Sequence, residues 1–113
     1  MASESSIHFD IEESSDGHHL PQTVIKCHGK LTSGNSKEIK DLVKPLIEAG
    51  GRQIVLDCGD LQSVDSSGLG TLVGLKVSAI GKGGKLKLVN LSPRVAELLK
   101  LTNLGDLLTI EYR

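Results

Sequence analysis

Aromatic residues are nearly absent from this chain of 113 residues, which contains one Phe, one Tyr and no Trp. Platforms of stacked aromatic side chains, which many single-stranded nucleic-acid-binding proteins use, are therefore excluded as a major device. The chain also lacks an excess of charge of either sign, because 13 Lys and Arg stand against 14 Asp and Glu for a formal net charge of -1. Without a basic excess, neither nucleic acid nor an anionic membrane surface is expected as a partner.

Long apolar runs are also missing. No segment reaches the roughly 18 apolar residues that a membrane-spanning helix needs, and no signal-peptide pattern opens the chain, so we expect a cytoplasmic protein without membrane insertion. The two cysteines, Cys27 and Cys58, fall in segments typical of buried strands, and we expect reduced thiols. No metal site is expected, because adjacent His18 and His19 side chains on an extended segment would point in opposite directions.

The length suits one domain, since domains most often have about 100 to 150 residues. We expect residues 1–6 to be a flexible N-terminus and residues 7–113 to form the domain. Alternating or continuous apolar residues predict strands over Ile7–Glu12, Thr23–Lys30, Gln53–Cys58, Lys85–Val89 and Leu108–Tyr112. Apolar residues at helical spacing predict helices over Ser36–Ala49 and Ser67–Ile80, and a third helix from Ser92–Pro93 to before Gly105.

The resulting order, β-β-α-β-α-β-α-β, predicts an α/β domain with a mixed sheet of about five strands. The apolar run Gln53–Cys58 is expected in the middle of the sheet, covered on both faces. Ser36 is a candidate N-cap of the first helix, and Pro45 is expected to kink or split it. Gly70 and Gly74, one turn apart in the second helix, suggest close approach to a neighbouring backbone.

The stretch between the central strand and the second helix is the most unusual part of the sequence. Asp60–Gly70 supplies three hydroxyls and two carboxylates where functional sites gather in open α/β sheets. The plain alternative is that Asp65, Ser66 or Ser67 only caps the helix. A nucleophilic serine is not indicated, because the small residues of a nucleophile elbow are missing. Gly81–Lys85 lacks the Gly and Ser/Thr of a phosphate loop and is expected to be a turn.

The run Val64–Gly70 followed by an apolar helix resembles the signature of STAS domains in bacterial anti-sigma factor antagonists, also called anti-anti-sigma factors. The resemblance extends to Ile54–Asp57, His28–Leu31 and Leu86–Pro93 and covers about nine-tenths of the chain. It implies a STAS domain without enzymatic activity or cofactor. The motif residues are Asp65, Ser66, Ser67, Gly68, Leu69 and Gly70.

The resemblance also implies a mechanism. Ser66 is the implied acceptor for a GHKL-type anti-sigma factor serine kinase, with Ser67 as a second candidate, and a serine phosphatase resets the switch. The unphosphorylated form binds the kinase and frees the sigma factor, and phosphorylation releases the protein. Gly68 and Gly70 are expected to keep the Ser66 hydroxyl accessible to the kinase.

The partner surface is expected to run from the exit of the second strand, across the motif, onto the exposed side of the second helix. Its expected members are Lys30, Thr32, Ser33, Asn35, Ser63, Asp65, Thr71 and Lys76. Lys30 and Thr32 stand where the family often has Glu and Asp, which puts the identity of the partner in question. The alternative function is a STAS subunit of a membrane lipid or anion transport assembly, in which Ser66 is structural.

Overall fold

The computed structural model describes residues 7–15, 21–102, 108 and 110–111. Its elements confirm the predicted order and are β1 (Ile7–Ser15), β2 (Pro21–Leu31), α1 (Ser36–Glu48), β3 (Gln53–Val64), α2 (Ser66–Gly81), β4 (Lys85–Val89), α3 (Pro93–Thr102) and β5 (Ile110–Glu111). The expected N-terminal segment 1–6, the His18–His19 pair and Gly105 lie outside the described residues.

The strands form one mixed sheet in the order β1-β2-β3-β4-β5, with β3 in the middle as predicted. β1 is antiparallel to β2, and the other neighbouring strands are parallel. β5 has only two residues, paired with Leu88 and Val89 of β4, so the last strand is shorter than the predicted Leu108–Tyr112. Leu108 is instead a buried residue before that strand, and Tyr112 lies outside the described residues.

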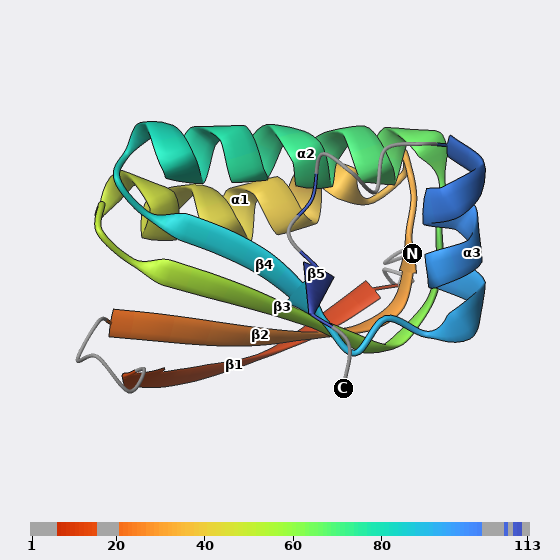
Figure 1. The fold of residues 1–113 in the computed structure, drawn as a ribbon, viewed down its shortest axis with the longest axis horizontal. Helices are drawn as coiled ribbons and strands as arrows, with labels where there is room; N and C mark the ends of the chain where they lie inside the picture. The colour runs from red at the N-terminus through yellow and green to blue at the C-terminus, as the bar shows by residue number, and fades with distance from the viewer. Residues whose placement is uncertain (1–6, 16–20, 103–107, 109, 112–113) are drawn as a thin grey trace, which may run out of the picture.

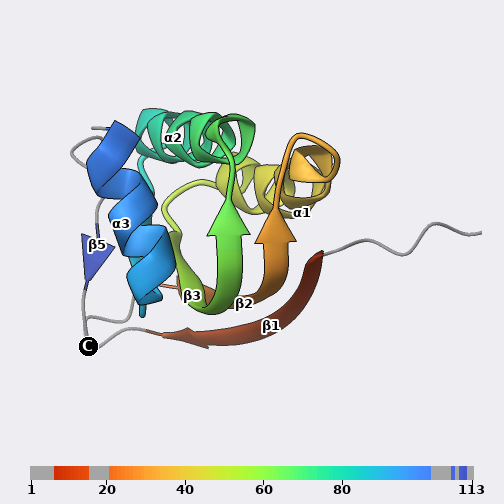
Figure 2. The ribbon, with the colours of Figure 1, turned by 90° about the vertical axis from the view of Figure 1, so that its right-hand side faces the viewer.

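β3 is twice as long as predicted, because it continues from Cys58 to Val64. Its pairing with β2 runs on through Lys30 and Ser63 to Leu31 and Val64, after two register shifts in the ladder. Such shifts bend a strand and increase its twist. The stretch expected to be a polar connection is therefore mostly strand, and it bends toward the helices (Figure 2).

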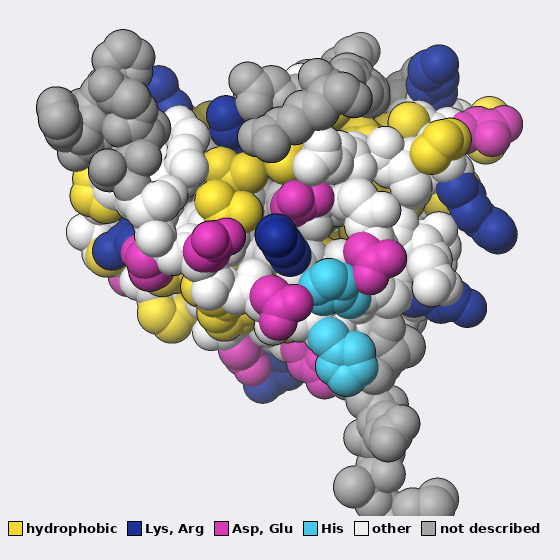
Figure 3. Space-filling view, turned by 90° about the horizontal axis from the view of Figure 1, so that it is seen from below, with side chains coloured by type: hydrophobic (Ala, Val, Ile, Leu, Met, Phe, Trp, Pro, Cys, Tyr) yellow, Lys and Arg dark blue, Asp and Glu magenta, His cyan; other side chains and the backbone are white. Residues whose placement is uncertain are grey.

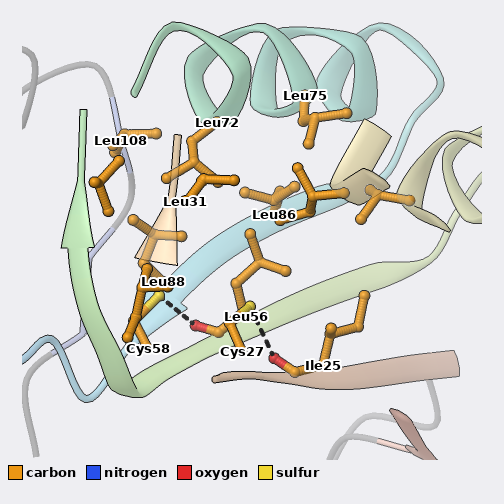
Figure 4. Packing of buried hydrophobic residues seen from close by; sticks show 14 of the residues in the cluster. Ile25, Cys27, Leu31, Leu56, Cys58, Leu72, Leu75, Leu86, Leu88 and Leu108 are labelled. Carbon is orange, nitrogen blue, oxygen red and sulfur yellow. Dashed lines mark hydrogen bonds between the residues drawn. The ribbon is translucent and has the colours of Figure 1, made fainter. Parts of the chain in front are cut away.

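Helices α1 and α2 lie side by side over one face of the sheet, and α3 packs against β3 beside β5 (Figures 1 and 2). The core between these layers is aliphatic, as the lack of aromatic residues requires (Figure 4). Its members come from the strands and from all three helices, among them Ile25, Leu56, Leu86, Ile39, Val43, Leu72, Leu75 and Val95. Burial of this apolar surface is the main force that holds the helices on the sheet.

The other face of the sheet is not covered by any helix in the described ranges. Acidic, lysine and histidine side chains gather there (Figure 3). The prediction that β3 is covered on both faces is confirmed only in part: Ile54, Val55 and Leu56 are buried in succession, whereas no helix in the described ranges lies over the second face. On this face the His28 ring joins three strands, because Nδ1 lies 2.6 Å from Asp60 Oδ2 and Nε2 lies 2.8 Å from Asp10 Oδ2.

The side of α2 that faces the core differs from the one that the apolar spacing indicated, which was based on Leu69, Leu72, Val73, Val77 and Ile80. Leu75 and Ala79 are buried, whereas Val77 and Ile80 are 65% and 59% exposed. Apolar residues occur almost all round this helix, so the pattern predicts the helix well and its buried side poorly. Gly81 ends α2 and β4 begins at Lys85, which confirms the turn predicted between them.

α1 differs from prediction at its start, where Asn35, not Ser36, occupies the N-cap position. The helix continues through Pro45 without being split, and the kink expected as the alternative stays a prediction. Pro45 removes one backbone donor, but neither helix nor core is interrupted there.

The two cysteines are buried free thiols, as predicted. Burial raises the pKa of Cys27 to about 12 and raises the pKa of Cys58 as well. Each Sγ faces a backbone carbonyl oxygen of its own strand, that of Ile25 for Cys27 and that of Leu56 for Cys58 (Figure 4). The thiolate form that reacts or binds metals is therefore disfavoured at both positions.

Candidate functional site

The predicted motif lies where β2 and β3 end and where α1 and α2 begin. Both strand ends bend up to the first turns of the two helices, so the β2–α1 loop and the β3–α2 junction are neighbours (Figure 2). The Asp65 N–H group donates a hydrogen bond of 3.1 Å to the Leu31 carbonyl oxygen. Two segments more than 30 residues apart in sequence thus form one surface.

Asp65 is the N-cap of α2, which selects one of the three cap candidates. Its Oδ1 atom accepts a hydrogen bond of 2.7 Å from the Gly68 N–H group. Its Oδ2 atom accepts one of 2.9 Å from the Ser33 N–H group in the β2–α1 loop. One carboxylate therefore satisfies the first turn of the helix and also holds the loop beside it.

The electrostatics of Asp65 follow from these contacts. Hydrogen bonds from the Gly68 and Ser33 N–H groups lower the pKa of the carboxyl group below its ordinary value, and the Ser67 N–H group adds a smaller effect in the same direction. The positive end of the helix dipole favours an anion at this position. The site already holds one negative charge before any modification.

Ser66 and Ser67 are the first two residues of α2, and both side chains are exposed. Neither hydroxyl is enclosed by the fold, so a partner can reach both. The Ser67 carbonyl oxygen accepts a hydrogen bond of 3.1 Å from the Thr71 hydroxyl. The geometry thus presents two hydroxyls at a helix N-terminus.

Gly68 has a packing role that we did not expect, and its role in keeping Ser66 accessible stays a prediction. It is buried, and a Cβ atom added there would lie 2.8 Å from the Leu31 carbonyl oxygen and 3.0 Å from Val64 Cγ1. Gly70 meets the opposite situation, because an added Cβ would have nothing within 4 Å, and the same holds for Gly74. The expected close approach of a neighbouring backbone is therefore found at Gly68 and not at Gly70 or Gly74.

Part of the predicted partner surface is brought together with the motif. Ser33 is bonded to Asp65 and exposed, Thr32 lies next to it, and Lys30 pairs with Ser63 in the β2–β3 ladder. Asn35 is 5% exposed, and its side chain accepts from the Thr32 N–H group and donates to the Lys30 carbonyl oxygen. Asn35 therefore stabilises the β2–α1 loop through hydrogen bonds within it and is not part of the exposed surface.

Two predicted members do not fit that surface. Thr71, expected on the exposed side of α2, is 7% exposed and its hydroxyl is used within the helix. Lys76 is half-buried and lines a hollow beside Ile80 and β4. It follows Ser66 by ten positions, a rise of about 15 Å along the helix.

Other kinds of site are not found in the described part of the chain. There, no group of three or more His, Cys, Asp or Glu side chains is arranged to hold a metal ion. In the same residues, no helix is long and apolar enough to cross a membrane.

Sequence reasoning found the motif but missed the bond between Ser33 and Asp65. The donor is the backbone N–H group of Ser33. Every residue except proline has such a group, so the residue type at this position gives no sign of the bond. The close contact of Gly68 with Leu31 was indicated only weakly by the sequence, through the presence of a glycine at this position.

Comparison with known proteins identifies a family and several relatives. The model of the STAS domain family matches residues 11–113. An anti-sigma-B factor antagonist of Bacillus subtilis is 33% identical over 89 residues, which are 79% of this chain and 81% of the relative. One of Staphylococcus aureus is 27% identical over 86 residues, 76% of this chain and 80% of the relative.

Solved structures share the fold. The anti-sigma factor antagonist SpoIIAA in its unphosphorylated form has a TM-score of 0.72 at 24% identity, covering 92% of this chain and 88% of that chain. The murine anion transporter Slc26a9 has a TM-score of 0.63 at 18% identity, with 71% of this chain matching 13% of that chain. At these identities the likeness shows the fold alone. The family match over residues 11–113 goes further, and the chain belongs to the STAS domain family.

Proposed function

We propose that this chain is an anti-sigma factor antagonist that acts by binding an anti-sigma factor serine kinase, and that phosphorylation of Ser66 by this kinase releases it. A serine phosphatase resets the switch. The observation that supports this proposal most strongly is the exposed Ser66 hydroxyl at the start of α2, directly after the N-cap Asp65. The names of the Bacillus and Staphylococcus relatives support the same function.

The fold tolerates a phosphate at this position. Ser66 is exposed, so the added group displaces no core residue. Backbone N–H groups and the helix dipole at the start of a helix stabilise an anion. We therefore expect phosphorylation to change association and to leave the structure intact.

The added charge is large enough to act as the switch. A phosphoserine carries about -1.5 to -2 charges, here next to the carboxylate of Asp65. One like-charge contact at 4 Å costs on the order of 4 kcal/mol at an effective dielectric constant of 20, before salt screening. A hundredfold loss of affinity requires only about 2.7 kcal/mol.

The test compares Ser66→Ala with Ser67→Ala as a matched control. Each purified variant is incubated with ATP and the purified anti-sigma factor serine kinase of the source organism, and phosphate is located by mass spectrometry. We expect Ser67→Ala to be phosphorylated like the parent, whereas Ser66→Ala takes up no phosphate and binds the kinase constitutively. Undiminished phosphorylation of Ser66→Ala would disprove the assignment.

A further inference from the structure

A groove between α1 and α2 starts beside the proposed phosphorylation site. It has a volume of about 570 Å³. α1 contributes Lys40 and Lys44 to its walls, and α2 contributes Ser67, Gly70, Gly74 and Ser78. Ser67 is the neighbour of Ser66, so one end of the groove lies at the switch and the groove follows the helices away from it.

The side of α2 that lines the groove includes two glycines, beside Ser67, Thr71, Leu75 and Ser78. Gly70 and Gly74 lie one turn apart, and a Cβ atom added at either would have nothing within 4 Å. Glycine inside a helix is less favourable than alanine, and within the described structure no contact requires glycine at these two positions. Glycine at both positions leaves room for a backbone from outside to lie close to α2.

The other side of the groove is basic. Lys40 and Lys44 are both exposed and, four residues apart, lie on the same side of α1. Neither ammonium group forms an ion pair with any residue in the described ranges, whereas Lys37 pairs with Asp41 on the same helix. Two neighbouring positive charges without acidic partners favour an acidic ligand.

We propose that this groove receives an acidic helix of the anti-sigma factor, an inference that rests on the proposed function. The partner's backbone lies over Gly70 and Gly74, and carboxylates one turn apart contact Lys40 and Lys44. From Ser67 to Ser78 the groove spans about 16 Å of helix rise, which matches about three turns of a helix. Helices laid into grooves are a common form of peptide recognition.

An acidic helix also explains the direction of the switch. Its end near Ser67 would meet the phosphate on Ser66, and two groups of the same charge repel each other in a desolvated interface. The lysines along the groove attract the helix in the unphosphorylated state. Phosphorylation then adds the opposing charge at one end, without any rearrangement of the fold.

The charge part of the proposal is tested by binding to the purified anti-sigma factor serine kinase, measured by titration calorimetry. We expect Lys40→Glu and Lys44→Glu each to weaken binding about tenfold or more. Lys100→Glu, an exposed lysine on α3, is the matched control and should change the affinity by less than about twofold. Raising the salt concentration should reduce the difference between the parent and the groove variants.

The shape part is tested by Gly74→Leu, with Gly81→Leu as the control on the same helix. Both positions have open space around an added Cβ atom, and only Gly74 lines the groove. We expect neither variant to lower the melting temperature, and only Gly74→Leu to weaken kinase binding.

The outcomes separate this inference from the proposed function. If the parent protein binds the kinase and all groove variants bind equally well, the groove assignment is overturned and the proposed function stands. If the parent does not bind the kinase at all, the groove assignment and the proposed function are both disproved. A self-association of the parent that Gly74→Leu abolishes, with kinase affinity unchanged, would assign the groove to a second copy of the chain and overturn the proposal.

Discussion

Replacing Gly68 with alanine adds one methyl group where the chain leaves no room. The new Cβ atom would lie 2.8 Å from the Leu31 carbonyl oxygen and 2.9 Å from Leu31 Cγ. Leu31 cannot easily move away, because its side chain is 1% exposed and its carbonyl oxygen accepts the Asp65 N–H group. The substitution must therefore shift either the core or the junction that carries the motif.

The magnitude follows from two opposing effects. Overpacking a well-filled site costs about 1 to 3 kcal/mol. Alanine is favoured over glycine in a helix by up to about 1 kcal/mol, and by less in the first turn where Gly68 lies. We therefore expect Gly68→Ala to lower the free energy of unfolding by about 1 to 2 kcal/mol, which corresponds to roughly 4 to 8 °C in melting temperature for each kcal/mol.

Gly74→Ala is the matched control, because the same methyl group there meets open space. It should raise the free energy of unfolding by about 0.5 to 1 kcal/mol through helix propensity alone. Urea unfolding of the three proteins, with equal slopes as a check on two-state behaviour, measures both changes. If Gly68→Ala is as stable as the parent, the close contact with Leu31 does not constrain this position.

Three further results are expected. Asp65→Ala should lower the free energy of unfolding by about 1 kcal/mol, through loss of the cap, and should speed amide exchange at Ser33; an unchanged Ser33 rate would refute the bond between loop and motif. Hydrogen bonds to Asp60 and Asp10 raise the pKa of His28 above its ordinary 6.5, so protonated His28 stabilises the folded protein. This contribution to the free energy of unfolding is complete below pH 6.5 and is lost as the pH rises through the raised pKa. His28→Gln should remove this part of the pH dependence of stability in urea unfolding, and identical pH profiles would contradict the cluster. Both cysteines should resist a thiol reagent in the folded protein and react in urea, and fast labelling without denaturant would contradict their burial.

Helices and their limits could be predicted well from local patterns. The predicted helix Ser36–Ala49 is one residue longer than α1 at its C-terminal end, and Ser67–Ile80 is one residue shorter than α2 at each end. Side-chain spacing and caps are local properties, so the sequence contains them directly. The buried side of α2 was harder, because Val77 and Ile80 are as apolar as the residues that face the core, and only the position of the sheet decides between them.

The full extent of β3 could not be predicted from local patterns, because it depends on pairing with β2, which lies far away in the sequence. Asp60 and Gln62 made the stretch after Cys58 look like a loop. Both side chains are exposed, and Asp60 pairs in register with His28 of β2 on the face without a covering helix. A strand with one open face tolerates polar residues there, so the polarity that argued against a strand indicates an uncovered sheet face instead.

The same distinction between local and distant contacts bears on how the proposed switch works. Oδ1 of Asp65 makes a local bond to the Gly68 N–H group, which the sequence offered as one of three caps. Oδ2 bonds to Ser33, 32 residues away, and fixes the β2–α1 loop to the start of α2. Because this carboxylate joins loop and helix into one surface, a charge added at Ser66 lies next to both without either having to move. A partner that covers both segments therefore meets the phosphate directly, which favours electrostatic repulsion over a conformational change as the means of release.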